Sequence, residues 1–325
     1  MPVHARFSTQ QVRAFRKRLL RWFDREQRKL PWRSEKDPYR ILVSEIMLQQ
    51  TRVAVVEERY KRFLRQFPTV QELARAREQT VLAAWSGLGY YRRARALHAA
   101  AKQVASEGKF PKQTSTLMDL PGVGRYTAAA VASIAFGEPV PVVDGNVKRV
   151  LERISGRRLS EQENWRIAGE LLEPGRPGDF NQAMMELGAV VCVPGEPRCH
   201  RCPVLMLCAA RGVVAARTTV RRRKALLRYI FAAKDGRVLL QQRPRDASLM
   251  AGMWELPEVA GPLSGMQPIA ELRHSITTTD YKVLVYAASD VCREGKWVAL
   301  NKVDRMALTG LAKKILRQIG SSVSS

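Results

Sequence analysis

The sequence predicts two domains, a larger all-α domain followed by a small α+β domain. Its 325 residues are enough for two hydrophobic cores, and a hydrophobic content of 46% is typical of a globular protein. Helical periodicity recurs from residue 8 to about residue 190, whereas strand-like runs dominate after Cys208. We therefore expect one domain over residues 1–215 and another over 228–325, joined by a basic linker at 216–227.

Proline and glycine separate the predicted helices of the first domain. The first helix begins after Ser8 or Thr9, and Pro38 opens a second that runs toward Gln50. The others are expected at 53–67, 70–76, 78–85, 91–107, 116–120, 126–136, 146–154 and 180–192. The first helix could instead be an arginine-rich targeting segment, but its apolar face favours an ordinary helix with a solvated basic face.

The C-terminal part changes in character at residues 217–224, a basic stretch without an apolar helical face. Strand-like runs follow at 226–233, 237–242 and 281–287, and Asp235-Gly236 is a turn signal between the first two. A closing helix is expected over 308–319. This order of elements predicts a small α+β domain.

The charge of the chain indicates a polyanionic partner. It has 55 Lys+Arg against 30 Asp+Glu, a formal net charge of +25 and a pI near 10.5. Such an excess attracts nucleic acid or anionic membranes. No apolar run approaches the length of a bilayer span or forms a signal-peptide core, so we expect the partner to be nucleic acid rather than a membrane. The expected location is the cytoplasm, in association with the nucleoid, and the expected state is a monomer.

Four of the five cysteines form a cluster, Cys192, Cys199, Cys202 and Cys208, while Cys292 stands alone. A disulfide scaffold would spread more cysteines through a shorter chain, so the cluster predicts a metal site in a reducing compartment. Four thiolates suit tetrahedral zinc or a cubane iron–sulfur cluster, although a single CxxC pair with unequal outer gaps is less typical of zinc ribbons. Cys292 is expected to be a buried structural thiol.

Residues 120–144 combine a glycine-rich turn between two helices with a carboxylate in an extended loop. Gly122 and Gly124 are expected to give the turn positive φ, and the amides that follow can hold a phosphate at a helix N-terminus. Asp144 then follows where it could face a sugar. A lone turn or a lone aspartate is usually structural, but together on a basic chain they indicate DNA base-excision chemistry.

Glu45 lies on the apolar stripe of the helix that Pro38 opens. An acid in this place is either paired for structural reasons or kept desolvated as a general acid, because burial raises a carboxyl pKa. The polar end of the helix, Gln49, Gln50 and Thr51, is well shaped to enter DNA and replace the contacts of an extruded base.

These features resemble the helix-hairpin-helix-Gly/Pro-Asp DNA glycosylases, the endonuclease III superfamily. The resemblance narrows to the adenine DNA glycosylases of the MutY type and extends over nearly the whole chain. It rests on Leu30-Pro31-Trp32-Arg33, on SEIMLQQT around Glu45, and on Gly87-Leu88-Gly89-Tyr90-Tyr91.

The resemblance implies a role for each matching residue. Glu45 would protonate N7 of a flipped adenine, and Asp144 would stabilise the oxocarbenium-like sugar. The residues that would contact the flipped adenine or probe the helix around the lesion pair are Trp32, Arg33, Leu48, Gln49, Gln50, Thr51, Tyr90 and Gln182. The cysteine spacing matches the [4Fe-4S] site of endonuclease III-like enzymes.

Tyr126 separates this enzyme class from its bifunctional relatives, which by the same resemblance carry a lysine at the hairpin position. A phenol cannot form an imine, so Tyr126 predicts a monofunctional glycosylase in which the phenol contacts the reacting sugar or Asp144. A tyrosine that only caps the hairpin core is the structural alternative. Lys148 is the nearest other amine, and a phosphate contact is expected for it.

The C-terminal domain resembles the MutT-like, Nudix-fold domain of the same family, on QQRP, SLMAGMWELP and WVALNKVDR. No acidic Nudix helix is found, so pyrophosphatase activity is not expected. In the family a Phe-Ser-His loop recognises 8-oxoguanine, whereas here Arg273-His274-Ser275 is followed by Ile276-Thr277-Thr278. Thr277 could supply a hydroxyl for the lesion, but Thr278 lacks a histidine ring.

The predicted function is removal of adenine from double-stranded DNA that contains A:8-oxoG or A:G. Two alternatives remain: a glycosylase/lyase for oxidised pyrimidines or thymine mismatches, and a non-catalytic iron–sulfur DNA-binding redox sensor. Tyr126 and the added C-terminal domain disfavour the first. Glu45 and Asp144 disfavour the second, because a sensor needs neither.

Overall fold

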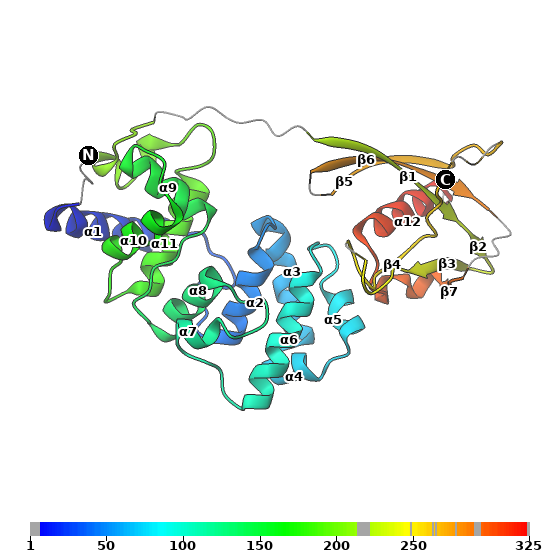
Figure 1. The fold of residues 1–325 in the computed structure, drawn as a ribbon, viewed down its shortest axis with the longest axis horizontal. Helices are drawn as coiled ribbons and strands as arrows, with labels where there is room; N and C mark the ends of the chain where they lie inside the picture. Colours follow the sequence, from blue (N-terminus) through cyan, green and yellow to red (C-terminus); the bar gives the residue numbers. More distant parts are fainter. Residues whose placement is uncertain are drawn as a thin grey trace. The chain divides into compact units, whose positions relative to one another are not determined.

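A computed structural model gives the fold for residues 7–212, 222–247, 249–261, 263, 265–276, 278–288 and 294–323 (Figure 1). The chain forms two compact units. The first comprises Met1–Ala74 and Ala99–Arg217, and the second comprises Arg75–His98 and Thr218–Ser325. The predicted boundaries at 215 and 228 stay a prediction, because residues 213–221 lie outside the described part of the chain.

The helical part of the chain contains α1 to α11 in sequence order (Figure 1). Their bounds are α1 Thr9–Glu26, α2 Pro38–Leu48, α3 Val53–Gln66, α4 Val70–Arg75, α5 Glu78–Ala84, α6 Arg92–Glu107, α7 Thr114–Leu117, α8 Arg125–Phe136, α9 Gly145–Ser155, α10 Glu161–Leu171 and α11 Pro177–Val190. Two short 3₁₀ turns, Cys199–Arg201 and Leu205–Leu207, follow in the cysteine segment.

Local capping signals explain where several helices begin. Ser8 and Gln11 form a reciprocal capping box on α1, and Asp37 caps α2 ahead of a proline at its first position. The helix α10 was not among the predicted elements. Its signal is a second capping box, in which Ser160 accepts from the Glu163 amide and Glu163 accepts from the Ser160 amide.

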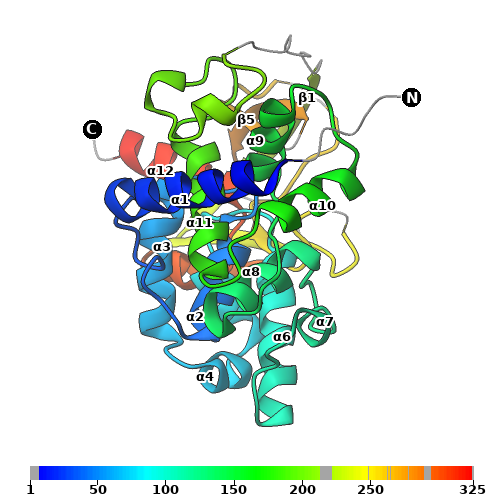
Figure 2. The same cartoon turned by 90° about the vertical axis from the view of Figure 1, so that its left-hand side faces the viewer.

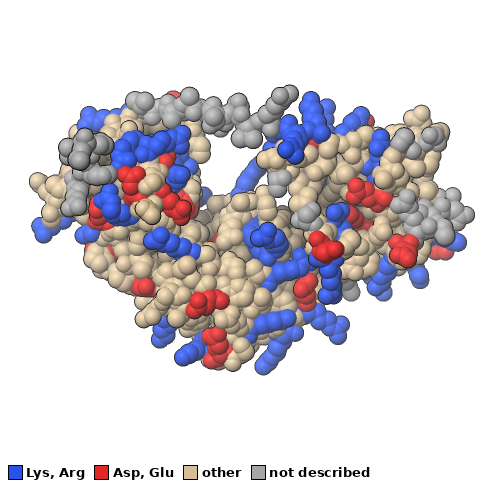
Figure 3. All heavy atoms as spheres, viewed as in Figure 1, with Lys and Arg blue, Asp and Glu red and all other residues tan. Residues whose placement is uncertain are grey.

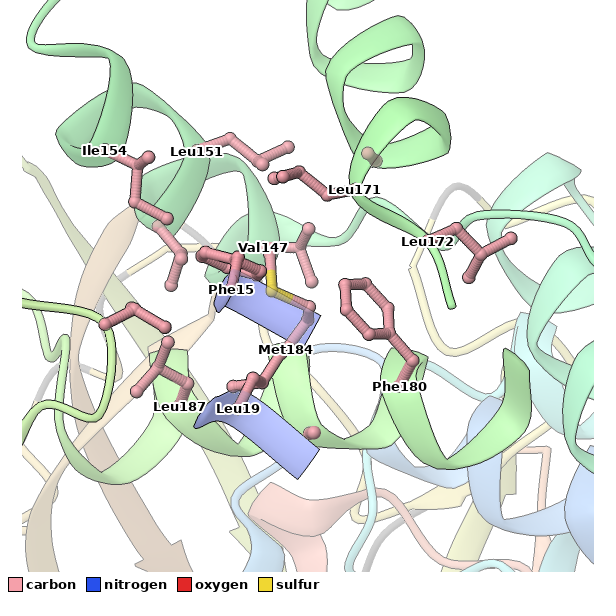
Figure 4. Close-up of a cluster of buried hydrophobic side chains, with 14 of the residues drawn as sticks. Phe15, Leu19, Val147, Leu151, Ile154, Leu171, Leu172, Phe180, Met184 and Leu187 are labelled. Atoms are coloured by element: carbon pink, nitrogen blue, oxygen red, sulfur yellow. The ribbon is translucent and has the colours of Figure 1, made fainter. Parts of the chain in front are cut away.

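One core of the first unit lies where α1 crosses α11 and meets α9 and α10 (Figure 2). Phe15 and Leu19 from α1 point toward Phe180, Met184 and Leu187 from α11 (Figure 4). The side chains that close this core from α9 and from the end of α10 are Val147, Leu151, Ile154, Leu171 and Leu172. Because α11 and α9 share this packing, the core fixes two helices that also border the candidate active site.

The C-terminal elements form two small sheets and a helix. Their bounds are β1 Arg223–Phe231, β2 Ala233–Lys234, β3 Arg237–Gln242, β4 Trp254–Glu255, β5 Ala270–Ile276, β6 Thr279–Ala287, β7 Lys296–Ala299 and α12 Gly310–Val323. In the first sheet β6 pairs in parallel with β1 and antiparallel with β5. In the second, β3 pairs antiparallel with β2, β4 and β7.

The predicted α+β character of this part is confirmed, and the core explains the sheet–helix arrangement. Val283 and Val285 of β6 are buried on one face of the strand, and they belong to one hydrophobic cluster with Leu311 and Ile315 of α12. The strands β4, β5 and β7 were not predicted. As a result Ile276, expected in the loop Ile276-Thr277-Thr278, is the last residue of β5, whose partner β6 begins at Thr279.

The segment Arg75–His98 groups with the C-terminal residues rather than with the other helices. The Tyr91 hydroxyl donates to the Leu308 carbonyl at 3.2 Å, and the Arg95 guanidinium donates to the Ala251 carbonyl. These contacts join residues far apart in sequence, which is why no local pattern predicts them.

Lysine and arginine side chains spread over the visible face of each unit and outnumber acidic ones there, as the composition predicts (Figure 3). Within the described residues, no helix combines the length and the apolar character that crossing a membrane requires.

Candidate active site

A cleft of about 980 Å³ in the first unit is bordered by residues of α2, α8, α9 and α11. The predicted site residues that line it are Trp32, Arg33, Glu45, Leu48, Gln49, Gln50, Thr51, Tyr126, Asp144 and Gln182. Five separate stretches of the sequence therefore contribute the predicted acid, the carboxylate and the base-contacting side chains to one cavity.

Glu45 lies on the buried face of α2 with only 5% of its surface exposed. The Tyr126 hydroxyl donates to its Oε2 at 2.6 Å. Burial raises the pKa of Glu45 to about 6, and the nearby Asp144 charge acts in the same direction, while the Tyr126 hydrogen bond and Arg33 oppose the rise. A carboxyl with this pKa can hold a proton near neutral pH and deliver it to a substrate.

Tyr126 lies in the first turn of α8, with its hydroxyl also 3.4 Å from Met185 Sδ. Burial raises the pKa of Tyr126 well above its ordinary value, and the charges of Glu45 and Asp144 add to this. The phenol therefore stays neutral and acts as a hydrogen-bond donor toward Glu45. The structure places Tyr126 against the acid rather than against Asp144, which the sequence had offered as a contact.

Asp144 is the N-cap of α9. Its Oδ1 accepts from the Val147 amide at 2.7 Å and its Oδ2 from Asn146 Nδ2 at 2.9 Å. Burial raises the pKa of Asp144, although these hydrogen bonds and Arg149 oppose the shift by favouring the ionised form. Asp144 therefore caps α9 and can also act in the cleft, because each of its carboxylate oxygens keeps a lone pair for a positive centre.

The end of α2 forms a tight turn at the rim of the cleft. Gln50 is exposed and has φ +54°, a left-handed conformation that non-glycine residues adopt rarely. The Gln49 amide donates to the Thr127 hydroxyl at 3.2 Å, and the Thr51 hydroxyl donates to the Gln49 carbonyl at 3.3 Å. These contacts tie the Gln49–Gln50–Thr51 turn to α8.

Arg33 and Gln182 belong to a charged network in the cleft wall. Arg33 donates to Gln182 Oε1 at 3.0 Å and to Glu186 Oε2 at 2.5 Å, and Arg28 donates to both oxygens of Glu186 at 2.7 and 2.9 Å. The two arginines hold the pKa of Glu186 below its usual range despite burial. Trp32 is 6% exposed, so little of its ring can face a ligand.

Glu186 and Asn146 are site residues that sequence reasoning missed. Glu186 is 1% exposed, lines the cleft and fixes Arg33, and Asn146 lines the cleft beside Asp144. A signal for Glu186 was available, because Gln182 and Glu186 are four residues apart and therefore share one helix face. For Asn146 the only signal was its position two residues after Asp144.

The glycine turn precedes α8 but does not border the cleft. Gly122 has φ +74°, as expected, whereas Gly124 has φ −85° and ψ 173° as the N-cap of α8. The expectation of positive φ is therefore wrong for Gly124, because its extended backbone is open to any residue. Beside the turn, the Arg125 guanidinium stacks over the Trp165 ring at 3.9 Å, and both side chains line the cleft.

Tyr90, which was also predicted to contact DNA, does not line this cleft. Tyr90 belongs to the second unit and is 44% exposed. Thr277 lies outside the described residues, as does Cys292.

The clustered cysteines, Cys192, Cys199, Cys202 and Cys208, line one small, apolar cavity of about 30 Å³. Arg153 donates to the Cys192 sulfur at 3.3 Å and to the Val193 carbonyl at 2.9 Å, so a cation is placed where a thiolate would need one. In the part of the chain that the structure describes, no three His, Cys, Asp or Glu side chains have the geometry to hold a single metal ion.

Comparison with known proteins agrees with this geometry. A family model described as HhH-GPD superfamily base excision DNA repair protein matches residues 43–174. The solved structure of a thermostable thymine-DNA glycosylase superposes with a TM-score of 0.59 and 30% identity, covering 62% of this chain and 97% of that one. The all-α, endonuclease III-like fold predicted for the first domain is confirmed by these matches.

Curated relatives narrow the assignment. A human adenine DNA glycosylase is 35% identical over 409 residues, which cover 94% of this chain and 74% of the relative. An adenine DNA glycosylase of Arabidopsis thaliana is 41% identical over 307 residues, 78% of this chain and 48% of the relative, so the chain spans about half of that protein. The chain belongs to the adenine DNA glycosylase family of base excision DNA repair proteins.

Proposed function

We propose that this protein hydrolyses the glycosidic bond of adenine mispaired with 8-oxoguanine, or with guanine, in duplex DNA. The observation that carries the proposal is the buried Glu45, whose pKa is raised to about 6 and which shares a cleft with Asp144. The names of the relatives support adenine as the excised base.

The reaction needs the two carboxyl groups in opposite protonation states. Glu45 delivers its proton to N7 of an adenine that has left the duplex, because a base protonated at N7 leaves as neutral adenine, which departs more readily than the adenine anion. Asp144, which its hydrogen bonds favour as a carboxylate, stabilises the positive charge left on the sugar. Water then completes hydrolysis. Tyr126 orients Glu45 through the 2.6 Å bond.

The cleft wall suggests how the base would be held. Arg33 is fixed by Gln182 and Glu186, so its remaining donors are presented in one orientation. The turn at Gln49–Gln50–Thr51, with Leu48, lies at the rim, where it could fill the space that the extruded base leaves. Tyr90 and Thr277 would act at the opposite base.

The test is base release from A:8-oxoG, A:G and T:G duplexes, each scored with and without alkali. We expect adenine release from the first two and strand cleavage only after alkali, because Tyr126 leaves the hairpin without the amine of a lyase. Release of thymine alone would contradict the substrate assignment, and release from none would favour the non-catalytic DNA-binding alternative.

A glycosylase/lyase is the second candidate, because Lys148 also lines the cleft. An amine in this place could attack the sugar and form an imine. Strand cleavage without alkali, together with borohydride trapping that Lys148→Ala abolishes, would support it. A Lys148→Ala variant with unchanged product and no trapping in the parent protein would exclude it.

We further propose that the four clustered cysteines hold a [4Fe-4S] cluster. Four thiols that line one apolar cavity suit such a cluster, and the Arg153 guanidinium beside the Cys192 sulfur would balance its charge. The cluster would supply a structural crosslink that shapes the surface around residues 192–208. No part in the hydrolysis is assigned to it.

Replacing Cys199 by serine should remove this cluster. We expect the purified protein to lose equal amounts of iron and acid-labile sulfide and its visible absorption, and to lose DNA affinity, because the segment between Cys192 and Cys208 is no longer held. Cys292→Ser, which removes a thiol outside the cluster, is the matched control. Stoichiometric zinc in the parent protein would contradict the proposal.

The C-terminal residues are proposed to form a MutT-like domain that recognises the 8-oxoguanine opposite the adenine. Arg273 of β5 and Lys314 of α12 place two cations beside the β5–β6 hairpin, with the Lys314 ammonium donating to the Arg273 carbonyl at 2.7 Å. This basic surface suits duplex DNA. A monomer associated with the nucleoid in the cytoplasm is the matching proposal for assembly and location.

A further inference from the structure

The backbone from Gly87 to Tyr90 is a strained turn just before α6. Gly87 has φ +94°, Gly89 has φ +68°, and Tyr90 has φ +45°. For a tyrosine this left-handed conformation persists only where surrounding contacts determine it. The Tyr90 side chain is 44% exposed, so those contacts must act on the backbone and on one side of the ring.

Arg93, in the first turn of α6, supplies contacts of both kinds. Its Nη2 donates to the Leu88 carbonyl at 3.0 Å and to the Gly89 carbonyl at 3.3 Å. The Trp85 indole N–H donates to the same Gly89 carbonyl at 3.1 Å. Two consecutive carbonyls are therefore turned toward Arg93 and Trp85, which leaves the peptide that follows Gly89 little freedom.

The guanidinium also lies beside two aromatic rings. Its central carbon is 5.6 Å from the Trp85 ring centroid and 5.4 Å from the Tyr90 ring centroid, within the range of cation–π attraction. Trp85 is fully buried, so Arg93 connects a fixed core side chain to an exposed one. Burial lowers the pKa of Arg93 to about 10, which still leaves it charged at neutral pH.

We propose that Arg93 is a positioning residue that holds Tyr90 in the conformation in which its exposed ring contacts the lesion pair. The inference rests on the proposed function, in which Tyr90 probes DNA around that pair. A ring that is already fixed loses less rotamer freedom on binding, so Arg93 strengthens DNA recognition without touching DNA. Lysine cannot replace it fully, because an ammonium lacks the planar fork that donates to carbonyls while stacking on rings.

The first test needs neither DNA nor activity. The full chain is labelled with 3-fluorotyrosine, and the Tyr90 fluorine resonance is assigned by its absence in Tyr90→Phe. Arg93→Met should move this resonance toward the position of free fluorotyrosine, and Arg93→Lys should move it part of the way. Arg92→Met, which removes an exposed cation from the same helix, should leave it in place. An unmoved resonance in both Arg93 variants would overturn the proposal.

The second test is a double-mutant cycle on affinity for an A:8-oxoG duplex. Arg93→Met should weaken binding by roughly tenfold, whereas the single-turnover rate at saturating enzyme stays within about twofold. In a Tyr90→Leu background the same substitution should cost at most about twofold, because a residue that acts through Tyr90 has nothing left to position. Equal losses in both backgrounds would overturn the proposal.

The two tests separate this inference from the proposed function. If the parent protein releases no adenine from any duplex, the proposed function fails, while the fluorine resonance still decides whether Arg93 holds Tyr90. Unfolding temperatures of all variants show whether Arg93→Met acts globally. A loss of folding in Arg93→Met leaves Arg93→Lys, which should retain the fold and show the partial shift.

Discussion

Replacing Glu45 by glutamine should lower the single-turnover rate of adenine release by about 10²–10⁴-fold, the range that a general acid contributes. Glutamine keeps the shape of the side chain, and its carbonyl can still accept the Tyr126 hydrogen bond. What it lacks is the carboxyl proton. Binding to an A:8-oxoG duplex should stay within about threefold of the parent, because no charge that contacts phosphate is removed.

The pH dependence of the rate should identify the same group. Glu45 with a pKa of about 6 is protonated below this value, so the rate should fall as pH rises through about 6. Glu58→Gln, the same exchange on the exposed face of α3, is the control and should keep the parent profile. A Glu45→Gln variant that still turns over would remove Glu45 from the mechanism.

The stability of the parent protein should also fall as pH rises, whereas the Glu45→Gln variant should escape this loss. The pKa of Glu45 is raised from an ordinary 4.5 to about 6, so the folded protein binds more protons than the unfolded chain between these values and loses stability as pH rises through them. At pH 8 the Glu45→Gln variant should therefore be more stable than the parent by about 2 kcal/mol. Urea unfolding of both proteins at pH 8 measures the difference, which should be absent for Glu58→Gln.

Much of the helical unit was predictable because its signals are local. Apolar periodicity placed α2, α3, α6 and α8 within a few residues of their observed bounds, and Pro38 marked the start of α2. The helix α10 was missed although its Ser160–Glu163 capping box is a local signal. In the C-terminal part, most residues of β5 and β7 are exposed or half-buried, so their identity as strands depends on pairing with β6 and β3.

The residues of the candidate site also divide into those that a local signal predicts and those whose contacts depend on the fold. Glu45 and Asp144 were predictable because each places a carboxylate where few occur, Glu45 on an apolar helix face and Asp144 in an extended loop. The structure brings both into one cleft. The bond from Tyr126 to Glu45 joins residues 81 positions apart, and the Arg33–Glu186 pair joins residues 153 apart. No sequence period links such residues, so these partnerships follow only from the packing of α2, α8 and α11.

Replacing Asp144 by asparagine should lower the single-turnover rate by about 10²–10³-fold, comparable with the loss of a group that stabilises transition-state charge. Asparagine is as good an N-cap as aspartate, so it can accept from the Val147 amide and keep α9 intact. The substitution therefore removes the negative charge and little else. Because the Asp144 charge raises the pKa of Glu45, the residual activity should also fall off at a lower pH than in the parent.

Two further variants separate charge from capping. Asp144→Ala should match Asp144→Asn in rate but be less stable by about 1 kcal/mol, because it loses the cap as well as the charge. Asp37→Asn makes the same exchange at the N-cap of α2, outside the cleft, and should leave the rate unchanged. If Asp144→Asn stayed within tenfold of the parent, Asp144 would be only a helix cap, and the cation on the sugar would need another partner in the cleft.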